Sequence, residues 1–123
     1  RAAKLQKRAS KVGFDWPETS MVFDKLHEEV DELKTAWREQ SGPQDRDAVE
    51  DELGDLLFVA VNLSRFLGVD AEQALRRANL KFERRFRRME EQLDAAGEGL
   101  KGRDIEALEA AWQRAKKASD ADS

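Results

Sequence analysis

Apolar positions recur every three or four residues along most of the chain, the spacing typical of helices that bury one face. Loops rich in glycine, proline or polar residues interrupt this pattern and mark the ends of the helices. The predicted helices span about residues 2–12, 20–40, 47–67 and 71–95, with a short last helix after residue 104. The pattern therefore predicts an all-α protein, a helical bundle of about four to five helices.

The third predicted helix is the most apolar one and should form the centre of the core. Its buried stripe is predicted to contain Val49, Leu53, Leu56, Ala60, Leu63 and Leu67. The stripe is widened by Leu57, Phe58, Val59 and Val61. A helix this apolar must be covered on most sides, and the first and last helices are too short to cover it. We therefore expect two chains to complete the bundle as a homodimer about a two-fold axis.

Two carboxylate pairs lie in the second and third predicted helices. Glu29 and Glu32 are three residues apart, as are Glu52 and Asp55, so each pair projects from one helix face. Glu52 also lies at the edge of the apolar stripe, where a carboxylate is costly unless something compensates it. Four like charges brought together repel each other unless a cation lies between them. Oxygen ligands favour a hard divalent ion, so we expect Mg²⁺, with Mn²⁺ as a substitute.

Several further residues are candidates for contacts with a substrate. Lys25 shares the flank of Glu29, whereas Glu28 points further out, as an ordinary solvated charge would. Lys81 and Arg85, one turn apart on the arginine-rich fourth helix, are placed to present two cations to a phosphate. Trp112 offers a flat face for stacking a base, and packing in the core is an equally good interpretation.

Composition narrows the class of protein. Charged residues make up 39% of the 123 residues and the net charge is −4, a poor basis for binding duplex nucleic acid. No cysteine is present, which fits a reducing cytoplasm, and no apolar run is long enough to span a membrane. Without cysteine, and with His27 as the one histidine, zinc is a poor candidate.

The length fits a single domain, which we place at residues 1–118, followed by a disordered tail at 119–123. Gly97, Gly99 and Gly102 are predicted to form a flexible link before the last helix. Phe14 and Trp16, in the first loop, are expected to pack at the edge of the core rather than bind a ligand. The first residue is not Met, which suggests a fragment of a longer protein.

These residues carry a resemblance to a known family. Lys25-x-x-Glu28-Glu29-x-x-Glu32, followed by Glu52-x-x-Asp55, resembles the signature of MazG-type nucleoside triphosphate pyrophosphohydrolases of the all-α NTP pyrophosphatase superfamily. Residues 8–16 and 79–86 also resemble the C-terminal catalytic module of MazG proteins, which often hold two such modules. The resemblance covers nearly the whole chain. It implies Mg²⁺-dependent hydrolysis of an NTP or dNTP to NMP and pyrophosphate, which would serve either house-cleaning of the nucleotide pool or control of stress nucleotides.

The resemblance also implies roles for individual residues. Glu29, Glu32, Glu52 and Asp55 match the metal ligands of the family. The positions that contact the nucleotide or assist catalysis are matched by Lys25, Glu28, Lys81, Arg85 and Trp112. In this mechanism a water attacks the α-phosphorus, Glu28 orients or deprotonates it, and the basic residues stabilise charge on the phosphates.

Other functions stay open on the sequence alone. The same scaffold resembles dUTP/dCTP pyrophosphatases and phosphoribosyl-ATP pyrophosphohydrolase, which a panel of nucleotide substrates would separate. A non-enzymatic helical interaction module, binding an acidic partner through the arginine-rich helix, is a further alternative. That alternative predicts no dependence on Mg²⁺ and no loss of function on Glu52→Gln.

Overall fold

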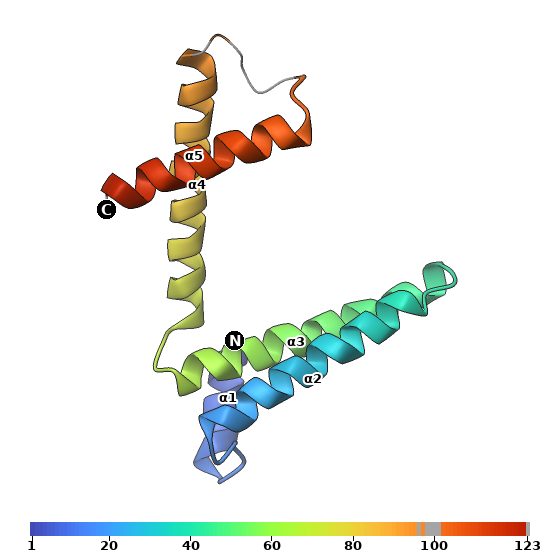
Figure 1. Ribbon diagram of the computed structural model, residues 1–123. Coiled ribbons are helices and arrows are strands. Elements are labelled where there is room, and N and C mark those ends of the chain that lie inside the picture. Colours follow the sequence, from blue (N-terminus) through green and yellow to red (C-terminus); the bar gives the residue numbers. More distant parts are fainter. Residues whose placement is uncertain (96, 98–101, 123) are drawn as a thin grey trace. The chain divides into compact units, whose positions relative to one another are not determined.

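The chain folds into five α-helices in a computed structural model that describes residues 1–95, 97 and 102–122, with side chains described up to residue 118 (Figure 1). The helices are α1 (Ala2–Lys11), α2 (Thr19–Arg38), α3 (Arg46–Phe66), α4 (Ala71–Ala95) and α5 (Ile105–Asp122). The described part contains no strand, which confirms the predicted all-α class. The first four helices begin and end within two residues of the predicted limits.

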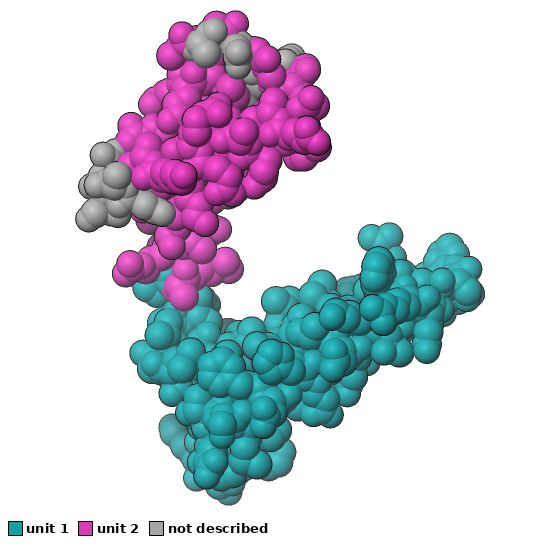
Figure 2. All heavy atoms as spheres, viewed as in Figure 1, with its two compact units in different colours: residues 1–73 teal, residues 74–123 magenta. Residues whose placement is uncertain are grey.

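The chain divides into two compact units, residues 1–73 and residues 74–123, which Figure 2 colours separately. We describe each unit by itself. Within the described residues, no helix is both long enough and apolar enough to cross a membrane.

The first unit is built around a hairpin of two helices, α2 and α3, which lie side by side (Figure 1). A short 3₁₀ turn, Pro43–Asp45, connects them. Asp45 closes this turn, because its Oδ2 accepts hydrogen bonds from the backbone N–H of Ser41 at 2.8 Å and from the Ser41 hydroxyl at 2.9 Å. The two hydrogen bonds hold the pKa of Asp45 below its ordinary value. The turn thus fixes the helices that carry both acidic pairs.

Helix α1 is tied to α3 by contacts between residues far apart in the sequence. The side chain of Gln6 is buried, and its Nε2 donates to the backbone carbonyl of Phe58 at 2.8 Å. The loop after α1 is held by a two-pronged ion pair, in which Arg65 donates to both carboxylate oxygens of Asp15 at 2.7 and 2.9 Å. Arg65 Nη2 also donates to Oδ1 of the buried Asn62 at 2.9 Å.

Much of the apolar surface of α3 remains uncovered within one chain. Leu53 is 44% exposed, Leu57 is 59% exposed and Leu67 is 55% exposed. The prediction that Leu53 and Leu67 belong to a buried stripe is therefore wrong for the single chain. The physical reason is that α2 and α1, the helices that pack on α3 within the first unit, cover only part of its circumference.

The second unit holds a small core between α4 and α5. Asp70 caps α4 by accepting a hydrogen bond from the backbone N–H of Gln73 at 3.1 Å. Asp104 caps α5 in the same way, through Ala107 at 2.8 Å. The buried side chains of this core are Met89, Leu93, Ala111 and Ala115, with Phe86, Leu108 and Trp112 packed against them.

Two predictions fall partly or wholly where the structure gives no description. Residues 96 and 98–101, which include much of the predicted glycine link, lie outside the described residues. The predicted disordered tail, 119–123, lies where no side chain is described, so it stays a prediction.

Candidate metal centre and the adjoining cavity

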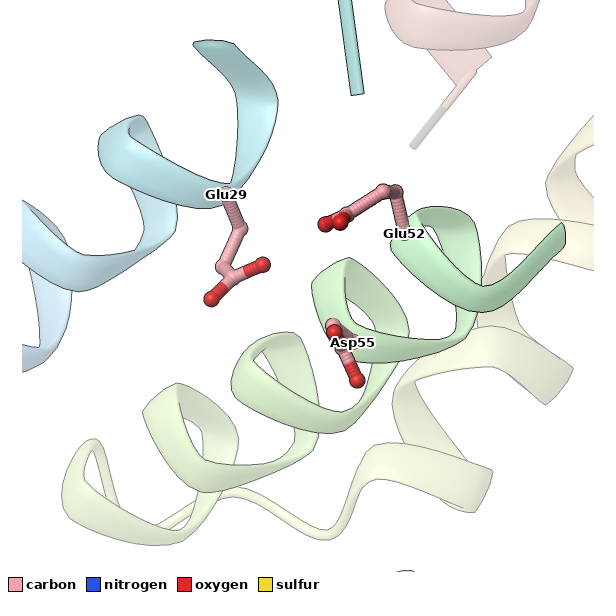
Figure 3. A group of neighbouring side chains, drawn as sticks. All are labelled: Glu29, Glu52 and Asp55. Carbon is pink, nitrogen blue, oxygen red and sulfur yellow. The ribbon is translucent and has the colours of Figure 1, made fainter. Parts of the chain in front are cut away.

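Three of the predicted carboxylates come together between α2 and α3. Each of Glu29, Glu52 and Asp55 offers a carboxylate oxygen, and these oxygens all lie within 4.8 Å of one another. Figure 3 shows Glu29 projecting from α2 toward α3, while Glu52 and Asp55 project from successive turns of α3. Glu52 and Asp55 are three residues apart, so they lie on the same face of α3, the face that borders α2. This spacing is why both side chains reach Glu29.

Glu29 lies deeper in the protein than any other carboxylate of the cluster. It is only 5% exposed, and Oε1 pairs with the ammonium group of Lys25 at 3.2 Å. This hydrogen bond, together with the charges of Glu28, Glu29 and Glu32, raises the pKa of Lys25 above its ordinary value. The other oxygen of Glu29, Oε2, is buried and has no hydrogen-bond partner among the described residues. The Oε2 atom of Glu52 is likewise buried and without such a partner.

Glu32 borders the cluster without belonging to the group of three. It is exposed, and it lines an open hollow of about 540 Å³ together with Glu28 and Glu52. The negative charge of Glu29, followed by partial desolvation and the charge of Glu52, raises the pKa of Glu32 above its ordinary value. A cation bound between the helices would remove the repulsion that causes this shift.

The residues of the cluster fit a hard divalent cation. All three donors are carboxylates, the ligand type that Mg²⁺ and Mn²⁺ take, and no thiolate or imidazole is among them. Leaving two buried carboxylate oxygens without donors costs free energy, and a cation held between Glu29 and Glu52 would satisfy both. His27 is exposed and is not part of the group, so the donor set does not favour zinc.

The remaining predicted site residues lie in different surroundings. In the first unit, Glu28 is largely exposed and lies 3.6 Å from Lys25 Nζ. In the second unit, Lys81 is exposed, Arg85 is half-buried, and the ring centroids of Trp112 and Phe82 are 5.2 Å apart. Trp112 therefore packs against the small core of its unit, which was the alternative interpretation of this residue.

A cavity of about 590 Å³ adjoins the carboxylate cluster and was not predicted from the sequence. Lys25, Glu29 and Asp55 line it, and so do aromatic and polar residues of α1, of the following loop and of α3: Gln6, Phe14, Trp16, Phe58, Asn62 and Arg65. Trp16 is half-buried, whereas Phe14 is 80% exposed and does not pack at the edge of the core as expected.

One signal in the sequence pointed toward this cavity. Gln6 is a polar residue between Leu5 and Ala9, on the apolar side of the first helix, where a polar side chain needs a specific partner. The partner itself is 52 residues away, beyond the reach of a local pattern.

Comparisons with a family model and with individual proteins both point to the same family. The sequence model of a family described as "MazG nucleotide pyrophosphohydrolase domain" matches residues 18–89, more than half of the chain. The chain is 47% identical over 117 residues to a "Nucleoside triphosphate pyrophosphohydrolase" of Escherichia coli K12, covering 95% of this chain and 44% of that protein. It is also 47% identical over 115 residues to a "Nucleoside triphosphate pyrophosphohydrolase/pyrophosphatase MazG" of Thermotoga maritima, covering 94% of this chain and 42% of that protein.

A more distant match extends over part of the chain. The Bacillus subtilis protein named "Uncharacterized protein YabN" is 40% identical over 65 residues, which are 53% of this chain and 13% of that protein. The chain thus spans less than half of the length of each of these three relatives.

Proposed function

Because this chain belongs to the MazG nucleotide pyrophosphohydrolase family, we propose that it hydrolyses nucleoside triphosphates to nucleoside monophosphate and pyrophosphate with Mg²⁺ as cofactor. The names of the two 47%-identical relatives support this activity. The observation that carries the proposal for this chain is the pair of buried carboxylate oxygens, on Glu29 and Glu52, that lack a donor among the described residues. Such a pair needs a cation, and a cation between carboxylates is the usual device for binding a triphosphate.

The proposed metal ligands are Glu29, Glu32, Glu52 and Asp55. Bound Mg²⁺ would neutralise charge on the triphosphate and lower the pKa of a water. Glu29 is held in place by its ion pair with Lys25, which leaves its second oxygen available for the cation. Glu32 is exposed at the border of the cluster and completes the set from the solvent side. Asp55 and Glu52 are kept one turn apart by the rigid third helix.

The reaction in this proposal is an attack of water on the α-phosphorus. The oxygen of the water forms a bond to the α-phosphorus, the bond between this phosphorus and the α–β bridging oxygen breaks, and pyrophosphate leaves with that oxygen. Glu28, exposed beside Lys25, orients the water or accepts its proton. Lys81 and Arg85 stabilise the charge that develops on the pyrophosphate, and Trp112 offers a face for the base.

Product analysis tests the reaction directly. The protein is incubated with ATP and Mg²⁺ in ¹⁸O-labelled water, and the products are identified by mass spectrometry. We expect AMP that carries the label, unlabelled pyrophosphate, and no turnover when Mg²⁺ is chelated. ADP and orthophosphate as products would contradict attack at the α-phosphorus, and turnover without a divalent ion would contradict the metal site.

We further propose that two copies of the chain pair as a homodimer. The support is the uncovered apolar surface of α3 (Leu53, Leu57 and Leu67), which a second copy would bury. Light scattering at micromolar concentration tests this directly, and an active species with the 14.0 kDa mass of one chain would exclude it.

A further inference from the structure

The charges of the first unit are distributed very unevenly along the chain. Residues 1–11, which are α1 and the residue before it, contain five basic residues and no acidic one. Residues 12–73 contain sixteen acidic and five basic residues, a net charge of −11. A nucleoside triphosphate is itself strongly anionic, so most of this unit repels the substrate of the proposed reaction. Helix α1 is the exception.

The five cations of α1 form a row on one side of the helix, which we call the basic stripe. At about 100° per residue they lie within about 120° of one another, and all five are exposed. The buried side chain of Gln6, which docks α1 on Phe58 of α3, lies on the other side of the helix. The basic stripe therefore faces away from α3, and its members are Arg1, Lys4, Lys7, Arg8 and Lys11.

The charges of the basic stripe are not neutralised by neighbouring acids. Among the described residues, none of the five cations takes part in an ion pair. Glu72, which lines a hollow with Arg1 and Lys4, pairs with neither of them. Unpaired charges of one sign add up to a field that acts at a distance, which is what the attraction of an oppositely charged ligand requires.

The basic stripe lies about one helix diameter from the cavity beside the carboxylate cluster. Leu5, Gln6 and Ala9 of α1 line this cavity together with Glu29 and Asp55. A helix with its side chains is about 10–12 Å across, whereas the Debye length is about 10 Å at 0.1 M ionic strength and about 30 Å at 0.01 M. The field of the stripe therefore reaches the site, strongly at low salt and weakly at high salt.

We propose that the basic stripe of α1 attracts the anionic substrate and speeds its association with the metal site, without touching the bound nucleotide. The inference rests on the proposed function and adds to it a surface that accelerates binding. The acidic residues around the metal site repel a triphosphate as it approaches, and a positive surface nearby offsets this repulsion. An attraction of this kind raises the association rate, depends on salt and leaves the dissociation rate nearly unchanged.

The test measures association with a nucleotide that cannot be cleaved at the α-phosphorus. Stopped-flow fluorescence records the binding of α,β-methylene ATP, labelled on its ribose, with Mg²⁺ present and at ionic strengths from about 0.01 M to about 0.5 M. One variant replaces three lysines of the stripe together: Lys4→Gln, Lys7→Gln and Lys11→Gln. We expect its association to be slower by about 10-fold at the lowest ionic strength and by less than about 2-fold at the highest, with little change in dissociation.

The matched control removes three charges of the same sign from the other end of the first unit: Lys34→Gln, Arg38→Gln and Arg46→Gln. These cations are exposed and lie at or near the turn between α2 and α3, whereas Figure 1 shows α1 at the opposite end of this hairpin. Phe58, on which Gln6 docks, is twelve residues from Arg46, or about 18 Å along α3. The control should slow association by about 2-fold or less at every ionic strength.

Equal slowing by the two triple variants would overturn the inference, since it would show an effect of net charge rather than of the stripe. A slowing that does not diminish with salt, or that one lysine produces alone, would also overturn it, because it would indicate direct contact with the nucleotide. Circular dichroism confirms the fold of each variant.

The same experiment separates failure of the inference from failure of the proposed function. If the labelled nucleotide does not bind to the intact chain, the proposed metal site fails together with the inference. If it binds and the stripe variant associates at the unaltered rate, the inference alone is overturned. Product analysis with ATP tests the reaction independently of both results.

Discussion

The two units of the chain bury different kinds of side chain. Among the described residues, the first unit buries a charged group and two amides, Glu29, Gln6 and Asn62, beside Val22 and Val59. The buried side chains in the described part of the second unit are all apolar: Met89, Leu93, Ala111 and Ala115. Buried polar groups cost stability unless they are satisfied, so proteins retain them mainly where they have a function. From this comparison we expect the first unit to carry the functional site and the core of the second unit to contribute mainly to stability.

The sharpest test of this comparison removes a charge from the carboxylate cluster. Glu52→Gln and Glu32→Gln should each lower turnover by roughly 1,000-fold or more at saturating Mg²⁺, because each removes a proposed ligand of the cation. Without Mg²⁺, each variant should unfold at the same or a higher temperature, since a repelling charge is gone. Glu50→Gln, an exposed change on the same helix, is the control. Near-normal turnover of both variants would remove the cluster from the mechanism.

A change in the core of the second unit should lower the stability of the fold rather than act through the metal site. Leu93→Ala removes a side chain that is 3% exposed and should lower the free energy of unfolding by about 3 kcal/mol. Leu80→Ala, at a position that is 54% exposed on the same helix, should lower it by less than about 1 kcal/mol. Thermal and urea unfolding measure both. Similar losses for the two variants would mean that Leu93 is not in a packed core.

A third prediction sets a limit to the comparison, because it assigns a chemical role to residues of the second unit. Lys81→Ala and Arg85→Ala should each lower kcat/KM for triphosphates by about 2 kcal/mol, or roughly 30-fold, by removing a charged contact to phosphate. Arg84→Ala, an exposed change on the same helix, should leave it nearly unchanged. If the double variant retains full activity, Lys81 and Arg85 belong to the solvated surface and the second unit has no part in the chemistry.

The smallest expected effect concerns the ion pair that holds the first loop. Hydrogen bonds from the Arg65 guanidinium lower the pKa of Asp15 from 3.8 to about 2. Since the pKa is lower in the folded chain, the pair stabilises the fold above pH 3.8 and loses this contribution as the pH falls toward 2. The partly exposed pair is worth about 1–2 kcal/mol after screening by solvent. Unfolding curves of Asp15→Asn should therefore differ from those of the intact chain at pH 6 and converge near pH 2.

Local patterns predicted the helices and the core of the site. Helical spacing placed Glu52 and Asp55 on one face of α3, and the structure brings Glu29 to them across the hairpin. The caps at Asp70 and Asp104 involve neighbours within three residues, so they too lie within the reach of a local pattern.

The adjoining cavity was beyond the reach of such patterns. Its two anchoring contacts join Gln6 to Phe58 and Asp15 to Arg65, which are about fifty residues apart. The exposure of Leu53 and Leu67 was missed for a related reason. Periodicity indicates which face of a helix is apolar, but it does not reveal whether that face is covered by the same chain or by another molecule.

The hairpin that carries the carboxylates also has a consequence for the order of folding. Glu29 and Glu52 lie on consecutive helices, α2 and α3, which are joined by a short connection. Pairing of these helices requires the closure of only a short loop, so we expect it to occur early in folding. Docking of α1 needs contacts about fifty residues apart and should follow. This early step brings the carboxylates of the two helices together, and their repulsion should slow the pairing. A divalent cation would reduce this repulsion, so the ion proposed for catalysis should also accelerate the first step of folding.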